Sequence, residues 1–243
     1  FILESSRREV TGLQFPCIFV RMENPNANLK EGFYSKLFAR FYDPFMESME
    51  QKVLGRYRKQ LLEPLTGNIL EVGSGTGINF KLYPKNCHVV ASEPSEHMLR
   101  YATERLRTET VEATIELVLA GVGSEELEKH VPENGFDAIV CTLVLCTIPN
   151  PELAVASFKK WLKPDGKLII LEHVHAQTQP RKAVHSFLNP AWKHFAEGCN
   201  LTRNTAKMLR DSGFEAEWEH DFIKLMPFHV AIMKLTRGKE SKT

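Results

Sequence analysis

Three glycines at alternate positions, Gly73, Gly75 and Gly77, follow a short apolar run, Ile69-Leu70-Glu71-Val72. The run predicts a buried strand that leads into a tight turn. Glycine suits such a turn because it tolerates a positive φ and has no Cβ to keep a ligand away from the backbone. We expect a short helix over residues 77–83 to follow, with free N–H groups that favour an anionic ligand group. The alternative is a tight turn that binds nothing.

A second signal is Glu93, which ends the next apolar run, twenty residues after Gly73. A carboxylate at this place can accept hydrogen bonds from both hydroxyls of a ribose. The glycine spacing differs from the G-x-G-x-x-G of dinucleotide-binding proteins, because Ile78 stands at the third glycine position. That difference argues against a nicotinamide enzyme. The pattern Glu-x-Gly-x-Gly-x-Gly followed by Glu-Pro resembles the signature of class I S-adenosylmethionine (SAM) methyltransferases.

This resemblance implies an α/β fold, a Rossmann-like doubly wound sheet with SAM as cofactor and S-adenosylhomocysteine (SAH) as product. In an open parallel sheet, ligands bind beyond the carboxyl ends of the strands, at the switch in strand order. The first two strand ends supply the candidate cofactor-binding residues, which are Glu71, Gly73, Ser74, Gly75, Thr76, Gly77, Asn79, Glu93, Pro94 and Ser95.

The elements that must position these residues alternate along the chain, which predicts right-handed βαβ connections and a parallel sheet. We expect strands at 68–72, 88–92, 114–119, 136–141 and 167–174, and helices at 77–83, 95–107, 151–162 and about 203–212. A turn over 163–166 should lead into the fifth strand. Two apolar-rich segments, 214–223 and 229–236, predict an antiparallel hairpin at the sheet edge.

The N-terminal part has a different pattern and is expected to form an arm and a helical lid over residues 1–64. Aromatic residues recur at helical spacing from residue 29, and a second helix should run from Asp43-Pro44 to about residue 62. The aromatic side chains are either plain core or part of a lid in which Tyr34 or Tyr42 reaches the cofactor. Residues 65–236 then form one SAM-binding domain, and the polar tail over 237–243 should be disordered.

The third and fourth strand ends complete the expected site. After the third strand come Gly121 and Val122, which carry no carboxylate, so backbone groups are expected to contact the adenine. After the fourth strand come Thr142 and Leu143, expected beside the sulfonium and the methyl acceptor. The apolar segment there lacks the Asn/Asp-Pro-Pro-Tyr signature of amino-group methyltransferases. An apolar wall argues against a flipped base as the substrate.

The candidate general bases are His173 and His175 at the end of the fifth strand, with Glu172 beside them, and His194 further on. His173 is taken as the catalytic candidate, although a single histidine is more often structural. A thiol acceptor is partly ionised at neutral pH and gains little from a base. Cys146 is a candidate reactive thiol, but packing is the preferred interpretation in an apolar run. Asn200 or Thr202 is expected to cap a helix.

Bulk composition excludes several classes of function. The chain has 243 residues and a formal net charge of +1, with Lys and Arg scattered, which does not favour nucleic-acid binding. Five cysteines without a C-x-x-C spacing indicate reduced thiols on the cytoplasmic side and no metal site. No apolar run approaches the ~20 residues of a transmembrane helix. Because the chain begins at Phe1, an upstream anchor is an open question, as are peripheral membrane contact and oligomeric state.

Several longer stretches are similar to one family, the thiol S-methyltransferase-like proteins. They are residues 75–84, 140–146, 172–174, 189–192 and 198–203, and the resemblance spans residues 65–236. Its animal members are alkyl-thiol methyltransferases of the endoplasmic reticulum and lipid droplets, so the resemblance implies S-methylation of a small, fairly apolar thiol. The chain departs from them at Glu93, where they have aspartate, and in an aromatic, charged N-terminal segment where they have a hydrophobic anchor. The alternatives are N- or C-methylation of a phospholipid or quinone, and a silent SAM-binding scaffold.

Overall fold

The computed structural model describes residues 53–173, 200, 202–223 and 227–236, the single residues 186, 187 and 189, and the backbone of 19–21. The strands are β1 (Phe19–Arg21), β2 (Gly67–Val72), β3 (Cys87–Glu93), β4 (Thr114–Leu119), β5 (Phe136–Thr142), β6 (Leu162–His173), β7 (Phe214–Ile223) and β8 (Pro227–Leu235). The helices are α2 (Gly55–Leu62), α3 (Glu96–Thr108), α4 (Glu125–Glu128), α5 (Pro151–Trp161) and α7 (Thr205–Asp211), with a short 3₁₀ helix, η2 (Phe80–Leu82).

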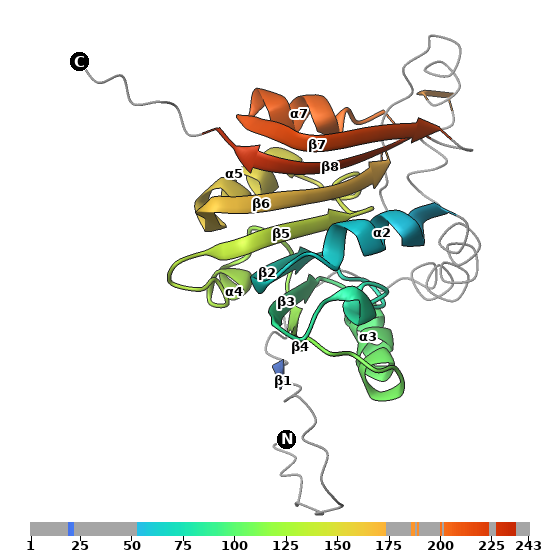
Figure 1. The fold of residues 1–243 in the computed structure, drawn as a ribbon, viewed down its shortest axis with the longest axis vertical. Coiled ribbons are helices and arrows are strands. Elements are labelled where there is room, and N and C mark those ends of the chain that lie inside the picture. The colour runs from blue at the N-terminus through green and yellow to red at the C-terminus, as the bar shows by residue number, and fades with distance from the viewer. Residues whose placement is uncertain are drawn as a thin grey trace, which may run out of the picture.

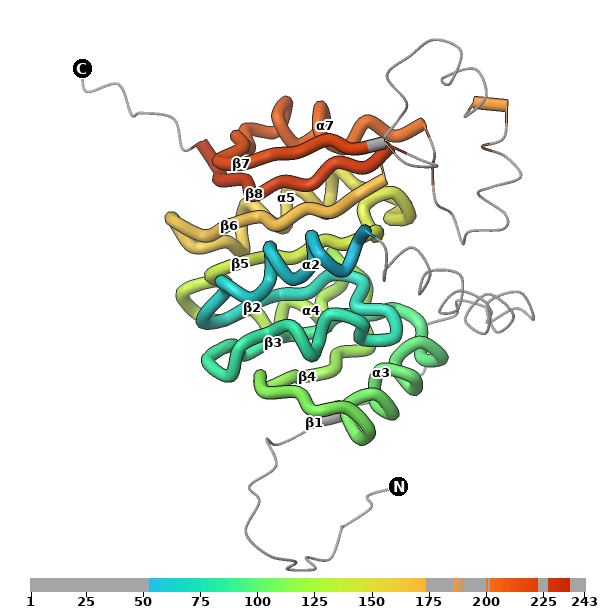
Figure 2. Tube along the Cα trace, turned by 45° about the vertical axis from the view of Figure 1, so that its right-hand side comes forward, coloured from blue at the N-terminus to red at the C-terminus, as the bar shows by residue number. Residues whose placement is uncertain are grey.

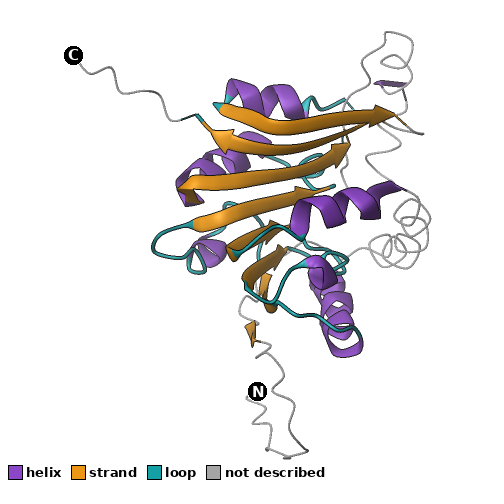
Figure 3. Cartoon of the chain, viewed as in Figure 1, coloured by secondary structure: helices purple, strands orange, loops and turns teal. Residues whose placement is uncertain are grey.

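Within the described residues, eight strands form one sheet in the order β1-β4-β3-β2-β5-β6-β8-β7 (Figure 3). The strands from β1 to β6 pair in parallel, and β8 runs antiparallel to both β6 and β7. The doubly wound sheet with a C-terminal hairpin, predicted from the sequence, is therefore confirmed. Strand order reverses beside β2, which is bonded to both β3 and β5. The switch point thus lies where the glycine turn leaves β2.

Helices cover both faces of this sheet (Figures 1 and 2). On one face α2 and α3 pack through residues such as Leu61 and Leu99, and on the other α4, α5 and α7 pack through Leu127, Phe158 and Leu209. The central strands are buried on both sides along most of their length, which explains why their sequences are rich in apolar residues without a strict alternation.

Helix starts follow local capping chemistry. The side chain of Ser95 accepts a hydrogen bond from the N–H of Met98 at the start of α3, and Asn150 does the same before α5, where Pro151 occupies the first turn. At α7 the cap is Asn204, whose Oδ1 accepts from the N–H of Lys207. The expectation that Asn200 or Thr202 caps this helix is therefore wrong.

Two expectations about the elements need correction, and two elements were not expected. The segment 77–83 forms turns and the single 3₁₀ turn of η2 instead of a helix, because Gly77 has φ +79° and Pro84 follows closely. The turn expected over 163–166 lies inside β6, whose register with β5 shifts between Phe136 and Ala138. The strand β1 and the single-turn helix α4 were not expected, since both are too short to show a periodicity.

Some expectations concern residues outside the described parts of the chain, including Tyr34, Tyr42 and the tail over 237–243. In the described parts, no helix has the length and apolar character needed to cross a membrane. The three cysteines described there, Cys87, Cys141 and Cys146, are free thiols and buried.

Candidate functional site

The three glycines of the turn after β2 serve different purposes. A Cβ on Gly73 would lie 2.2 Å from Cγ2 of Val144, and one on Gly77 would lie 2.3 Å from the ring of Phe80. These two positions therefore stay small so that the protein can pack against them. Gly75 also has a positive φ, +56°, yet nothing lies within 4 Å of the place where its Cβ would be. The space above Gly75 is an open cradle in which a ligand can approach the backbone.

The carboxylate of Glu93 joins the glycine turn to the start of α3. Its Oε2 accepts a hydrogen bond from the N–H of Gly75 at 2.9 Å, and its Oε1 accepts one from the N–H of Ser95, also at 2.9 Å. The side chain is 8% exposed. A carboxylate oxygen can accept more than one hydrogen bond, so these two contacts are compatible with a ribose hydroxyl at the same carboxylate. Glu93 therefore shapes the turn as well as offering acceptors to a ligand.

A buried polar network lies under the turn. Glu71 accepts hydrogen bonds from Asn79 Nδ2 at 2.7 Å and from the hydroxyl of Tyr83 at 3.0 Å. Arg58 Nη1 donates to Asn79 Oδ1 and to Thr142 Oγ1, both at 2.8 Å. Asn79 Nδ2 also donates to Thr142 Oγ1 at 3.1 Å. The network thus connects helix α2, the glycine turn and the end of β5.

Burial changes the protonation of this network. Removal from water raises the pKa of Glu71 to about 7, although bonds from Asn79 and Tyr83 and the charge of Arg58 oppose the shift. Burial, together with the nearby Glu71 carboxyl, also raises the pKa of Tyr83 well above its usual value. The first carboxyl of the glycine motif therefore titrates near neutral pH, and Tyr83 remains a hydrogen-bond donor.

Arg58 and Tyr83 are site residues that were not expected from the sequence. A signal for Arg58 exists, because Leu54, Arg58 and Leu61 share one face of α2 by their helical spacing, and all three are buried. An arginine on the apolar face of a helix indicates a buried partner. Tyr83 gave no comparable signal.

The segments after β4 and β5 also lie at the carboxyl edge of the sheet. Gly121 follows β4, and a Cβ there would lie 3.8 Å from Cβ of Pro94, so the segments after β3 and β4 adjoin. Thr142 ends β5 within the Arg58 network. Among the described residues, Leu143 is the non-glycine residue with a positive φ, +60°. Such backbone strain is concentrated at functional sites.

Comparison with known proteins decides the family. A family model described as a methyltransferase domain matches residues 45–217. The chain is 32% identical over 202 residues to thiol S-methyltransferase TMT1B of Rattus norvegicus, and 81% of each chain is covered. It is 34% identical over 148 residues to thiol S-methyltransferase TMT1A of Homo sapiens, covering 60% of this chain and 59% of the relative. This chain belongs to the methyltransferase domain family.

The methyltransferase fold is also seen in a solved structure, the DhpI–SAH complex. It matches with a TM-score of 0.53 at 19% identity, over 83% of this chain and 93% of the other. The chain is a SAM-dependent class I methyltransferase. Its open cradle at Gly75 and the two acceptor oxygens of Glu93 fit the cofactor, because a nucleoside can approach the backbone there and find partners for its ribose hydroxyls.

The predicted base of the methyltransferase lies on β6, two strands from β2 in the sheet. His173 ends β6, is 3% exposed, and packs edge-on against Phe228 with ring centroids 6.1 Å apart. Its neighbour Glu172 faces a different partner, since its Oε1 accepts from the N–H groups of Val144 and Leu145. No comparison tests the roles of individual residues, so His173 as a base stays a prediction.

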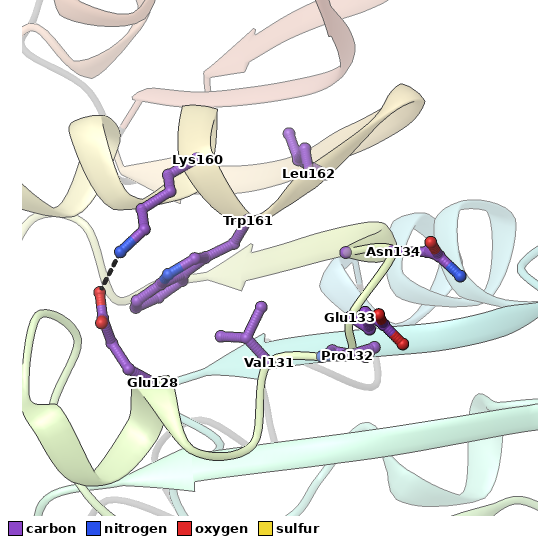
Figure 4. Close-up of a pocket in the computed structure, with 9 residues that line it drawn as sticks. Glu128, Val131, Pro132, Glu133, Asn134, Lys160, Trp161 and Leu162 are labelled. Carbon is purple, nitrogen blue, oxygen red and sulfur yellow. Dashed lines mark hydrogen bonds and ion pairs between the residues drawn. The ribbon is translucent and has the colours of Figure 1, made fainter.

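A surface hollow of about 330 Å³ lies elsewhere in the methyltransferase. It is lined by the loop before β5 and by the end of α5, including Pro132, Lys160 and Trp161 (Figure 4). An ion pair of 2.9 Å between Lys160 and Glu128 borders it. These segments precede β5 and β6, so the hollow is at the amino edge of the sheet, opposite the glycine turn. It is therefore separate from the cofactor site.

Proposed function

We propose that this methyltransferase transfers the methyl group of SAM to the sulfur of a small, fairly apolar thiol. The observation that carries the proposal is the 32% identity to thiol S-methyltransferase TMT1B across 81% of both chains. The character of the segment after β5 supports it: Leu143 and Val144 are partly exposed beside the glycine turn, and they offer apolar contact to an alkyl chain.

The residues of the site contribute mainly alignment. When bound, SAM supplies a methyl group carried on a positively charged sulfur, and SAH is the product. The glycine turn and Glu93 hold the nucleoside, while Thr142 and the Arg58 network fix the end of β5 against that turn. Leu143 and Val144 exclude water from the acceptor, and holding two reactants in line accounts for much of the rate of such a displacement.

Proton removal needs little help from the protein. A thiol whose pKa is close to that of free cysteine, about 8.5, is partly thiolate at neutral pH, so it can lose its proton to solvent before the sulfur attacks. The buried position of His173 supports a reaction without an obligatory histidine base. An amine or a ring carbon would place greater demands on a base, which favours the thiol.

The test is a panel of acceptors with methyl-labelled SAM, comprising an alkyl thiol, phosphatidylethanolamine and a reduced quinone. We expect label in the thiol product. The methylation rates of wild type and His173→Asn should differ by less than the factor of about 10² expected for loss of a general base. Label in the amine or quinone above that in the thiol would replace the proposal with N- or C-methylation. SAM binding without label in any acceptor would favour a silent scaffold.

We further infer that the enzyme works in a reducing compartment, on the cytoplasmic side. The support is that Cys87, Cys141 and Cys146 are free thiols and buried. Free thiols persist where glutathione and thioredoxin keep them reduced.

A further inference from the structure

Residues 143–148, which follow β5, form a tight turn at the carboxyl edge of the sheet. The N–H of Leu143 donates to the carbonyl of Leu171 at 2.8 Å. The N–H groups of Val144 and Leu145 donate to Oε1 of Glu172 at 2.9 and 2.8 Å. The N–H groups of Thr147 and Ile148 then donate back to the carbonyl of Val144 at 2.9 and 3.2 Å. Two N–H groups thus converge on one oxygen of the buried Glu172 carboxylate, which fixes the start of the turn.

The carbonyls of this turn are bound by a distant part of the chain. Arg203 Nη1 donates to the carbonyl of Leu145 and, at 2.9 Å, to the carbonyl of Ile148. The N–H of Asn200 donates to the carbonyl of Cys146 at 3.0 Å. Arg203 lies just before α7, so its positive charge reaches the turn after β5 from an element on the far side of β6. One guanidinium nitrogen bridges two carbonyls and closes the turn.

The other side of the turn touches the cofactor site. Cγ2 of Val144 lies 2.2 Å from the point where a Cβ on Gly73 would be, so Val144 packs against the glycine turn. Leu143, the first residue after β5, has a positive φ. A leucine keeps such a conformation only where its surroundings hold it. The hydrogen bonds of Glu172 and Arg203 restrain the two ends of the turn. The rigidity of residues 143–148 therefore depends on the contacts that Glu172 and Arg203 make with them.

We propose that Arg203 is a positioning residue for the methyl acceptor: it holds residues 143–148 as the acceptor wall without touching the acceptor itself. This inference rests on the proposed function above, because it assigns that wall to the thiol. A planar guanidinium can satisfy both carbonyls at once, whereas a lysine ammonium at the same place acts as a single point charge. Loss of Arg203 should loosen the wall and leave the cofactor turn, which depends on Glu93, in place.

The kinetic test compares Arg203→Met, Arg203→Lys and the control Arg210→Met. Arg210 is an exposed arginine on α7 that forms an ion pair with the carboxylate of Glu219, away from the turn. We expect the KM for the acceptor to rise about tenfold in Arg203→Met, the size of one lost charge-assisted bond, with a smaller rise in Arg203→Lys. The affinity for SAH, measured by calorimetry, should stay within about twofold, and Arg210→Met should match wild type.

A second readout does not depend on turnover. Hydrogen exchange of the peptide over 143–149 should be faster in Arg203→Met than in wild type or Arg210→Met, while the peptide over 71–79 should be unchanged. Unchanged exchange over 143–149 would overturn the inference, as would equal losses in acceptor KM and SAH affinity. If the wild type methylates an amine or a quinone instead of a thiol, the proposed function fails, and the same kinetic comparison is made on that acceptor. If it methylates nothing, the exchange measurement alone decides.

Discussion

Glu71 is a carboxyl whose environment favours its neutral form. Its pKa rises from 4.5 to about 7 because the side chain is buried beneath the glycine turn. Below about pH 4.5 the folded and unfolded states both hold the proton. Between pH 4.5 and about 7 the unfolded chain releases it while the folded chain retains it, so stability falls as the pH rises. Above about pH 7 the full cost of the buried charge is present.

Replacing this carboxyl with an amide of the same shape should remove the pH dependence. We expect Glu71→Gln to unfold at the same denaturant midpoint as wild type near pH 4.5. At pH 8.5 it should be more stable by up to roughly 3 kcal/mol, the equivalent of the shift at 1.36 kcal/mol per pH unit. Urea unfolding without SAM measures this. The exposed Glu63→Gln is the control, and a Glu71→Gln curve parallel to wild type at all pH values would contradict the assignment.

Single residues differ in how far the sequence could predict their role. Glu93 was expected to face a ribose because it ends an apolar run. In the structure its Oε2 lies 2.9 Å from the backbone nitrogen of Gly75, in the glycine turn. Arg58 acts through Asn79 and Thr142, which are 21 and 84 residues away along the chain. Pairings over such distances depend on the packing of α2 against the sheet, and no local pattern encodes them.

Among the elements, the glycine turn offers the sharpest test of the cofactor site. At Gly75 a Cβ would meet nothing within 4 Å, so Gly75→Ala adds a methyl only to the space assigned to SAM. We expect the variant to fold and to lose about 1–2 kcal/mol of stability from the left-handed backbone. Its affinity for SAH should fall by more than about 1.4 kcal/mol, which is tenfold. Calorimetry and urea unfolding provide the two measurements.

A matched control for the turn exists at Gly213, after α7. Its φ is +90° and the nearest atom to an added Cβ is Cδ1 of Leu235, at 3.9 Å. Gly213→Ala should therefore carry a similar backbone penalty and leave SAH affinity unchanged. If both variants lose affinity equally, the loss reflects general strain and the cradle at Gly75 is not the cofactor site.

At the scale of the whole molecule, the sequence predicted the sheet because burial on both faces leaves a simple pattern. Runs such as 68–72 and 136–141 are mostly apolar, and a glycine precedes each of them. The helix predicted over 77–83 was wrong. Its apolar residues suggested a helix, whereas Gly77 and the packing of Phe80 against it permit one 3₁₀ turn. Strand β1 pairs with β4 from a distant part of the chain, and three residues carry too little pattern to predict that.

The apolar layers on the two faces of the sheet differ in whether they support the cofactor site. Leu61 on α2 belongs to the layer beside Arg58, and Leu209 on α7 belongs to the layer on the opposite face; both are fully or almost fully buried. Each Leu→Ala change should destabilise the protein by about 2–5 kcal/mol through lost burial and a cavity. Only the Leu61 cavity, one turn from Arg58, should let α2 move and disturb the network under the glycine turn.

We therefore expect Leu61→Ala to lower SAH affinity several-fold, while Leu209→Ala leaves it near the wild-type value. Calorimetry at a temperature where both variants are folded, checked by circular dichroism, makes the comparison. Equal stability losses with unequal SAH affinities would mean that cofactor binding depends on one face of the sheet, through Arg58, Asn79 and Thr142. Equal affinities in the two variants would mean that the network tolerates a shift of α2, and that the turn is held by Glu93 alone.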